Sequence, residues 1–308
     1  MNTHQQTSYA GNTPAKPFYL PTRTLQEQSR LTFQHHALKA ALEGNFLAPC
    51  AHPMAILDVV CGNGVWTAEM GKLFPKAEII GLDLRIPTCP QSPRFQFIEG
   101  HTPSSLPFND ARFDYVHQRC LSTVIPTMHW QGIINELARV TQPGGWVELM
   151  EYGSYVSVGP ATQQFCLWWQ GVLAKRGIDL KAVEHLGQLL QNAGLTRVEQ
   201  KTLPISLYGG RAGDAMTTNL ISMIRNAQTS IVALGVDQKA FDKVVGALPK
   251  EWQAHKTTYR FHVAYGQRES HRTLFDAAGH SLTNRSVDVR RSRVPKVFVM
   301  QQQETCYA

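Results

Sequence analysis

The sequence predicts an α/β fold in which a mainly parallel sheet carries helices on both faces. Residues 56–60 form a short apolar run around Asp58, and glycines follow before a helical pattern starts at Val65. A second apolar run, residues 79–84, carries Asp83 near its end. Strands that alternate with helical patterns in this way are typical of βαβ units. The first half of the chain is therefore expected to form a parallel sheet.

The remaining elements follow from apolar periodicity and from helix and turn signals. Thr24 is a suitable N-cap for a helix that Gly44 ends, and Pro75 ends the helix that starts at Val65. Further strands are predicted at residues 94–99, 113–119, 146–152, 195–207 and 257–266. Further helices are predicted at residues 131–140 and 183–193, with an aromatic helix around 165–173 and a largely helical stretch at 209–250.

The turn that contains Gly62 and Gly64 is the first candidate for a binding site. Glycine lets the backbone approach a ligand closely, and the helix that follows points unpaired N–H groups at that ligand. Asp83 closes the neighbouring strand, where a carboxylate is placed to bind ribose hydroxyls. This pair of features predicts a cofactor built on a nucleoside.

The glycine pattern separates two cofactors of this kind. A dinucleotide fingerprint needs a third glycine at the position that Thr67 occupies. Asp58 stands before the turn, where its charge repels a pyrophosphate but attracts the ammonium of a methionine moiety. The pattern therefore favours S-adenosylmethionine over NAD, and an NAD-dependent enzyme remains the less favoured alternative.

Composition narrows the class of protein. The chain has 308 residues, 43% of them hydrophobic, which is enough for one large core. It has no apolar run of membrane-spanning length, and residues 1–16 lack the apolar segment of a secretory signal, so we expect a cytoplasmic protein with no membrane partner. The six cysteines form no C-x-x-C pair, which predicts neither a metal site nor disulfides. A net charge of +7 without nucleic-acid motifs indicates a solvated surface rather than nucleic-acid binding.

Polar residues gather where the fourth and fifth strands end. Ligands of open α/β sheets bind beyond these carboxyl ends. His117 and Arg119 share one face of the fourth strand and Gln118 takes the other, because side chains alternate. Glu151 and Tyr152 close the fifth strand. A buried structural histidine competes with a catalytic role for His117, and an ion pair with Arg119 competes with a general-base role for Glu151.

Several segments carry a family resemblance. Residues 58–64 resemble motif I of class I methyltransferases, acid-x-G-x-G-x-G, with Val60 in place of the first glycine. Together with it, residues 31–36 (LTFQHH), 45–49 (NFLAP), 113–119 (FDYVHQR) and 143–148 (PGGWVE) resemble the LaeA/UMTA-like branch of class I S-adenosylmethionine-dependent methyltransferases, a branch of the secondary-metabolism type. The resemblance covers about residues 18–268.

The resemblance implies a Rossmann-like, seven-stranded methyltransferase sheet whose last strand is antiparallel, with helices on both faces, an N-terminal helical lid and a helical substrate cap. The expected boundaries are a disordered N-terminus at 1–17, the lid at 18–50, the methyltransferase domain at 51–268 with cap insertions at about 154–190 and 209–250, and a C-terminal tail at 269–308. The lid carries Gln34, His35 and His36 as polar candidates. The lid and the tail could each be exchanged between subunits, so the sequence allows a homo-oligomer.

The resemblance also implies roles for individual residues. Contacts with S-adenosylmethionine are expected from Tyr19, Asp58, Cys61, Gly62, Gly64, Trp66, Asp83, Leu84, His101, Thr102 and Gln118. Catalytic roles are expected for His117, Arg119, Glu151 and Tyr152. The acceptor is expected to meet Tyr19, Arg119, Tyr152, Trp168 and Trp169.

The working hypothesis is methyl transfer from S-adenosylmethionine to a small, largely apolar, natural-product-like acceptor, with S-adenosylhomocysteine as the second product. The sequence does not choose between O-, N- and C-methylation. The alternative is a LaeA-like regulatory or protein methyltransferase, or a binding module whose affinity for the cofactor Val60 weakens.

Overall fold

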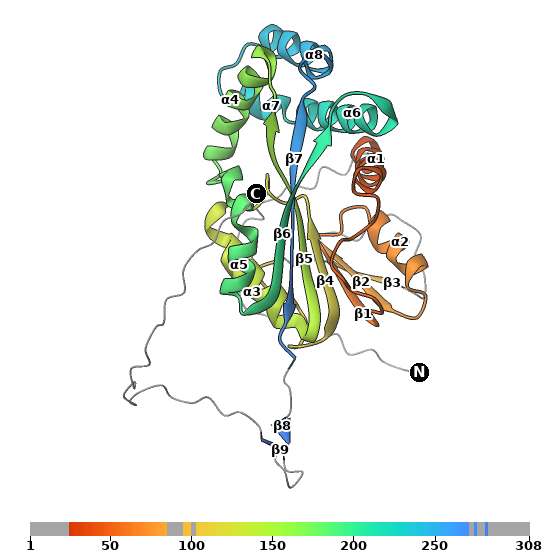
Figure 1. The fold of residues 1–308 in the computed structure, drawn as a ribbon. Helices are drawn as coiled ribbons and strands as arrows, with labels where there is room; N and C mark the ends of the chain where they lie inside the picture. The colour runs from red at the N-terminus through yellow and green to blue at the C-terminus, as the bar shows by residue number, and fades with distance from the viewer. Residues whose placement is uncertain (1–24, 85–94, 100–102, 271–273, 276–280, 283–308) are drawn as a thin grey trace, which may run out of the picture. The chain divides into compact units, whose positions relative to one another are not determined.

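The computed structural model describes residues 25–84, 95–99, 103–270, 274–275 and 281–282 (Figure 1). The chain divides into two compact units, Met1–Ser270 and His271–Ala308. In the second unit, β8 (Leu274–Phe275) and β9 (Ser281–Leu282) form an antiparallel pair. All features discussed below belong to the first unit.

The first unit is built on a seven-stranded sheet of order β3-β2-β1-β4-β5-β7-β6. Strands β1 to β5 are parallel, and β7 runs antiparallel to both β5 and β6. This confirms the predicted class of fold, including its reversed last strand. The strands are β1 (Ala55–Val59), β2 (Glu78–Asp83), β3 (Phe95–Glu99), β4 (Phe113–Arg119), β5 (Thr141–Val156), β6 (Leu195–Ser206) and β7 (Thr258–Arg268).

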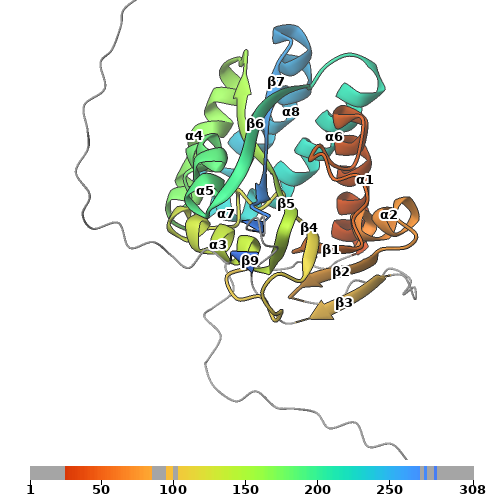
Figure 2. The ribbon, with the colours of Figure 1, turned by 60° about the horizontal axis from the view of Figure 1, so that its bottom comes forward.

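Helices cover both faces of the sheet. In Figures 1 and 2, α1 (Leu25–Leu42) and α2 (Val65–Leu73) lie on one side, and α3 (Trp130–Val140) and α5 (Leu186–Asn192) lie on the other. Ile56 belongs to the apolar cluster on the α2 side, and its neighbour Leu57 belongs to the cluster on the α3 side. Burial on both faces explains why these parallel strands are continuous apolar runs.

A second group of helices packs beyond the carboxyl ends of the parallel strands, where β5 and β7 extend past β4 (Figure 1). The group contains α4 (Pro160–Ala174), α6 (Gly210–Asn226), α7 (Gln228–Val232) and α8 (Gln238–His255). The side chain of Glu251 on α8 accepts hydrogen bonds from the backbone N–H groups of Ala161 and Thr162, so it caps α4.

Two boundaries differ from the sequence predictions. Strand β5 starts at Thr141 rather than Trp146, because the Pro-Gly-Gly segment runs inside the strand at a register shift opposite Phe113 and Tyr115. Gly145 is required there, since a Cβ would lie 2.8 Å from the carbonyl oxygen of Asp114. The helix predicted at 183–193 is divided into the 3-10 helix η2 (Leu180–His185) and α5. Periodicity alone does not register such local changes of helix type.

Strands β1 and β4 are each followed directly by a left-handed residue that is not glycine. Val60 has φ 58° and Cys120 has φ 61°. For a β-branched residue this conformation costs about 1–2 kcal/mol. Val60 therefore adopts the backbone that the missing first motif glycine would allow, while its side chain packs partly buried against the apolar cluster on the α3 side.

This conformation makes Val60→Gly a testable change. Relief of backbone strain offsets the loss of a partly buried side chain, so we expect the free energy of unfolding to change by no more than about 1 kcal/mol. Val59→Gly is the matched control, because Val59 is fully buried in an ordinary strand, and we expect it to destabilise by about 3 kcal/mol. Urea denaturation compares the two variants, and equal destabilisation would contradict the strain argument.

Candidate functional site

The turn after β1 has the geometry expected for a ligand-binding loop. Gly62 has φ 62°, and Gly64, with φ 76°, is the residue before α2. The N–H of Cys61 donates to the carbonyl of Leu82, which ties the turn to β2. The first N–H groups of α2 consequently face the carboxyl edge of the sheet.

Asp83 ends β2 beside this turn. Its Oδ2 atom accepts a hydrogen bond of 2.8 Å from the N–H of Gly62, and the residue is 1% exposed. This hydrogen bond fixes the position of the Asp83 carboxylate at the carboxyl edge of the sheet. Cys61 is also buried, and Leu84 is half-buried at the strand end.

Asp58 and His117 lie side by side under the turn, on the α2 face. Asp58 accepts a 2.6 Å hydrogen bond from the hydroxyl of Thr67, and its other oxygen lies 3.4 Å from Nδ1 of His117. The His117 ring stacks on Trp66 with centroids 3.9 Å apart, and burial lowers its pKa. Both side chains therefore bond inside the protein, as the structural interpretation of His117 expects.

A buried polar cluster lies on the opposite face at the ends of β4 and β5. Glu151 accepts hydrogen bonds through Oε2 from the backbone N–H groups of Leu121 and Ser122, at 2.6 and 2.7 Å. Burial raises the pKa of Glu151 to about 8, so the side chain is mainly protonated at neutral pH. Neither polar atom of the Gln118 side chain nor Oε1 of Glu151 makes a hydrogen bond of standard geometry within the described part of the chain, although Gln118 is close enough to Glu151 to lower its pKa slightly. Such buried atoms fit a site that receives polar groups of a ligand.

The alternative ion pair between Glu151 and Arg119 is absent from the described residues. Residue 150 of β5 lies opposite Arg119, which places Arg119 on the face of Tyr152 and away from that of Glu151. Arg119 instead contacts Nδ1 of His35 at 3.0 Å.

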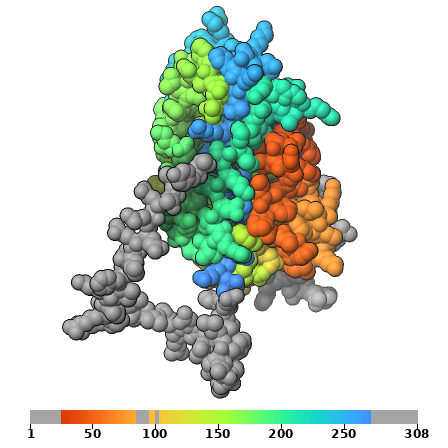
Figure 3. Space-filling view, viewed as in Figure 1, coloured from red at the N-terminus to blue at the C-terminus, as the bar shows by residue number. Residues whose placement is uncertain are grey.

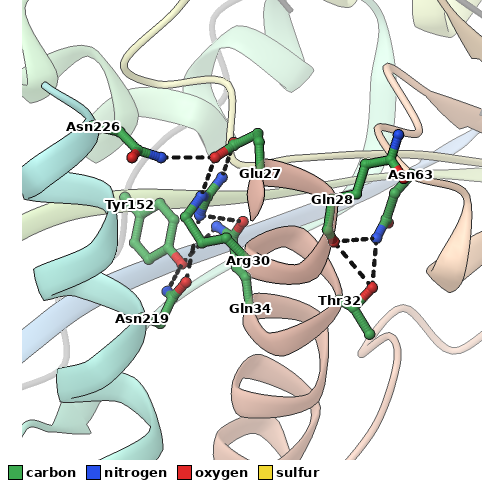
Figure 4. A network of polar contacts seen from close by, with 9 residues as sticks. All are labelled: Glu27, Gln28, Arg30, Thr32, Gln34, Asn63, Tyr152, Asn219 and Asn226. Atoms are coloured by element: carbon green, nitrogen blue, oxygen red, sulfur yellow. Dashed lines mark hydrogen bonds and ion pairs between the residues drawn. The ribbon is translucent and has the colours of Figure 1, made fainter. Parts of the chain in front are cut away.

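Helix α1 covers the turn. Asn63 donates hydrogen bonds to the carbonyl of Gln28 and to the hydroxyl of Thr32, at 3.1 and 2.8 Å (Figure 4). A Cβ on Gly62 would lie 3.5 Å from Cδ1 of Leu31, so α1 approaches the turn closely. Figure 3 shows the surface of α1 between those of α2 and α6. Helix α1, which was expected to fold over the cofactor, thus contacts the glycine turn.

A polar network joins α1 to Tyr152 and α6 (Figure 4). The Tyr152 hydroxyl accepts hydrogen bonds from the side-chain amides of Gln34 and Asn219, at 2.9 and 3.2 Å. Arg30 bonds Glu27 through two nitrogens, at 2.8 and 2.6 Å. Burial raises the pKa of Tyr152, so its hydroxyl is neutral. In the described structure Tyr152 therefore holds the lid rather than facing an open pocket.

A cavity of about 1080 Å³ lies beyond the end of β4. It is lined mainly by α4, by the far part of β5 and by the region around η2. Trp169, Phe165 and Tyr155 form part of its apolar wall. Trp168 does not line it and stacks on Phe241 instead, with ring centroids 6.5 Å apart. The two neighbouring tryptophans predicted to meet the acceptor thus have different surroundings.

Three predicted contacts, Tyr19, His101 and Thr102, lie outside the described residues. Sequence reasoning did not assign roles to Asn63, Leu31, Ser122 or Asn219. Asn63 lies between the two glycines of the motif, so its position could have identified it as a residue of the binding turn. Asn219 belongs to a distant helix, and only folding brings it to Tyr152.

Comparison with known proteins defines the class. A family model described as a methyltransferase domain matches residues 32–200, just over half of the chain. The chain belongs to this methyltransferase-domain family. Together with the sheet order and the glycine turn, this makes it an S-adenosylmethionine-dependent methyltransferase.

Individual proteins that resemble the chain include methyltransferases of fungi and a structure from a cyanobacterial antibiotic pathway. The chain is 24% identical over 278 residues to the N-methyltransferase tcpN of Claviceps purpurea, covering 81% of this chain and 96% of the relative. It is 30% identical over 124 residues to the methyltransferase str2 of Strobilurus tenacellus, covering 39% of this chain and 44% of str2, so that match spans less than half of the relative. The structure of a protein from an antibiotic biosynthesis pathway of Anabaena variabilis matches with TM-score 0.50 and 17% identity, covering 77% of this chain and 98% of that one. No described helix has the length and apolarity to cross a membrane.

The contact between Asn63 and α1 generates a prediction about the lid. Asn63→Ala removes its two hydrogen bonds to α1, each worth about 1 kcal/mol, so we expect the backbone amides of α1 to exchange with solvent roughly tenfold faster or more. Hydrogen–deuterium exchange measures this. Asn192→Ala, which removes hydrogen bonds on α5, is the control. Unchanged exchange in α1 would show that Asn63 does not hold the lid.

Glu148 generates a prediction about pH. This fully buried side chain accepts hydrogen bonds from the backbone N–H groups of Leu47 and Ala48, just after α1. Burial raises its pKa to about 7, against 4.5 for the ordinary side chain. The protonated form is therefore favoured by folding, and its contribution to stability is complete below about pH 4.5 and is lost as pH rises through about 7.

The variant Glu148→Gln cannot ionise and lacks this dependence. Relative to wild type, we expect its free energy of unfolding to improve by on the order of 1–3 kcal/mol between pH 5 and pH 8. Denaturant titrations at both pH values give the difference. A constant difference would mean that the pKa of Glu148 is ordinary.

Proposed function

We propose that the protein transfers a methyl group from S-adenosylmethionine to a small, largely apolar acceptor that binds in the cavity beneath α4. The cavity is the observation that carries this proposal, because its walls are mainly aromatic and aliphatic and its volume suits a natural-product-sized molecule. Gln163, Gln170 and Asp179 add a few polar groups at which such a molecule can be oriented.

The position of the cavity supports an elongated acceptor. Met150 of β5 lies opposite Arg119 at the end of β4, and the cavity begins at Gly153. At about 3.3 Å per strand residue, the cavity starts roughly 10 Å beyond the strand end where the cofactor is expected. An acceptor that fills the cavity and also reaches the transferable methyl group must span this distance.

The cofactor side of the site follows from the turn. Asp83 would hold the ribose hydroxyls, and the backbone around Gly62 would contact the methionine end. Gln118 offers both a donor and an acceptor at the strand end. Asp58 would act on the cofactor through the electrostatic field of the turn, because its oxygens already contact Thr67 and His117.

The bound cofactor supplies a methyl group that its sulfonium already activates. The chain therefore has to align the acceptor and exclude water, which the α1 lid is placed to do. If the acceptor atom is nitrogen or oxygen, a proton must leave. Glu151 is the candidate to exchange this proton, because its pKa of about 8 lies close to neutral pH and Oε1 has no hydrogen-bond partner among the described residues.

The relatives support nitrogen as the first acceptor atom to test. The N-methyltransferases tcpN and verN match over 81% and 82% of this chain. Secondary metabolism regulators named laeA match over 32% of the chain in Coprinopsis cinerea, 59% in Aspergillus niger and 62% in Aspergillus fumisynnematus. A regulatory role thus has support over a shorter part of the chain.

The neighbouring tryptophans give a matched test. Trp169→Ala removes part of the cavity wall, so we expect the KM for apolar acceptors to rise about tenfold or more while affinity for S-adenosylhomocysteine is retained. Trp168→Ala changes the packing on Phe241, and we expect it to lower stability and leave KM within about threefold.

The assay measures S-adenosylhomocysteine release with a panel of lipophilic amines, phenols and alcohols. Equal effects of the two variants on KM would place the acceptor elsewhere. Transfer to a protein, with none to any member of the panel, would favour the regulatory alternative.

A further inference from the structure

Arg119 is a cation without an acidic partner in the described structure. It is the last residue of β4, next to fully buried Gln118, and its own side chain is half-buried. No described carboxylate lies within 4 Å of its guanidinium nitrogens. Because a partly desolvated charge is costly when it has no partner, this position calls for an anion.

The guanidinium of Arg119 contacts His35 on helix α1. One of its terminal nitrogens lies 3.0 Å from Nδ1 of His35. Arginine only donates, so Nδ1 accepts and the proton of the neutral ring is on Nε2. Nε2 lies 3.3 Å from Oε2 of Glu69, an electrostatic contact that is outside hydrogen-bond geometry. Burial and the charge of Arg119 lower the pKa of His35 to about 4, which keeps the ring neutral.

Glu69 completes the support. Burial alone would raise its pKa, but hydrogen bonds from Lys39 and Asn45 bring it to about 2, so it is ionised. Lys39 and Asn45 contact it at 2.6 and 3.1 Å. The same tautomer argues against a metal at His35, His36 and Glu69, because Nε2 of His35 then offers no lone pair and an ammonium already occupies the carboxylate.

Helix α1 places the contact between Arg119 and His35 next to the glycine turn. Leu31 and His35 are one helical turn apart, so they share the face of α1 that covers the sheet. Leu31 approaches Gly62, and His35 contacts Arg119. The glycine turn and the guanidinium therefore lie against the same face of α1, one helical turn apart.

We propose that Arg119, positioned by His35 and Glu69, recognises a carboxylate of a ligand bound beside the glycine turn. The planar fork of arginine suits a carboxylate better than any neutral group. The carboxylate belongs either to the methionine end of the cofactor or to an acidic group on the acceptor. The second source rests on the proposed function, whereas the first does not.

The first arm of the test distinguishes the cofactor. Calorimetry compares S-adenosylhomocysteine with 5′-methylthioadenosine, which lacks the amino-acid end, on wild type and on Arg119→Met. If the carboxylate is the cofactor's, the variant binds S-adenosylhomocysteine roughly 10- to 100-fold more weakly and methylthioadenosine equally well. Arg112→Met, at a surface ion pair with Glu78, is the control.

The second arm tests the acceptor, with the protein saturated by S-adenosylhomocysteine. If the carboxylate is the acceptor's, wild type binds octanoate at least tenfold more tightly than octanol, and Arg119→Met abolishes this preference while leaving its affinity for both nucleosides unchanged. Failure of wild type to bind either probe rejects the apolar acceptor, and the nucleoside arm then decides the role of Arg119.

His35 is tested as a positioning residue. His35→Asn keeps an acceptor for Arg119 and should retain most of the affinity, whereas His35→Leu should reproduce much of the loss seen in Arg119→Met. The proposal is overturned if Arg119→Met changes neither S-adenosylhomocysteine binding nor the octanoate preference. Equal weakening of both nucleosides also overturns it, because that result indicates a general loss of lid structure.

Discussion

The hydrogen bond from the N–H of Gly62 to the carboxylate of Asp83 is the contact on which the rest of the site depends. It joins the end of β2 to the turn after β1. The hydrogen bond therefore fixes the position of the Asp83 carboxylate relative to the first N–H groups of α2. Left-handed backbone at Val60 and Gly62 brings the turn into this position. The hydrogen bond also fixes the orientation of the Asp83 carboxylate at the end of β2.

Helix α1 is attached to the rest of the protein through hydrogen bonds between polar side chains. Helix α1 contacts the turn through Asn63, β4 through Arg119 and α6 through the network around Tyr152. Such hydrogen bonds contribute about 1 kcal/mol each, and most have water as an alternative partner once the lid lifts. Helix α1 is thus held over the turn by polar contacts.

The two faces of the sheet divide the remaining work. Asp58, His117 and Glu148 on the α2 face bond to Thr67, to each other and to the backbone after α1, so they hold the turn and the lid. Gln118 and Glu151 on the α3 face keep unpartnered polar atoms within the described structure. Neighbouring residues of one strand thus serve different faces of the sheet, and on the α2 face Nε2 of His117 is also unpartnered within the described structure.

The sequence by itself determined the class of fold, the glycine turn and most element positions. The bounds of β4 were predicted without error, because apolar runs, acids at strand ends and helix stops are local signals. Tertiary structure alone decided which side chains meet. Gln34 and Asn219 are 185 residues apart yet share the Tyr152 hydroxyl, and adjacent Trp168 and Trp169 have different surroundings. Such contacts depend on how helices pack across the end of the sheet, and packing depends on the whole chain rather than on any one segment.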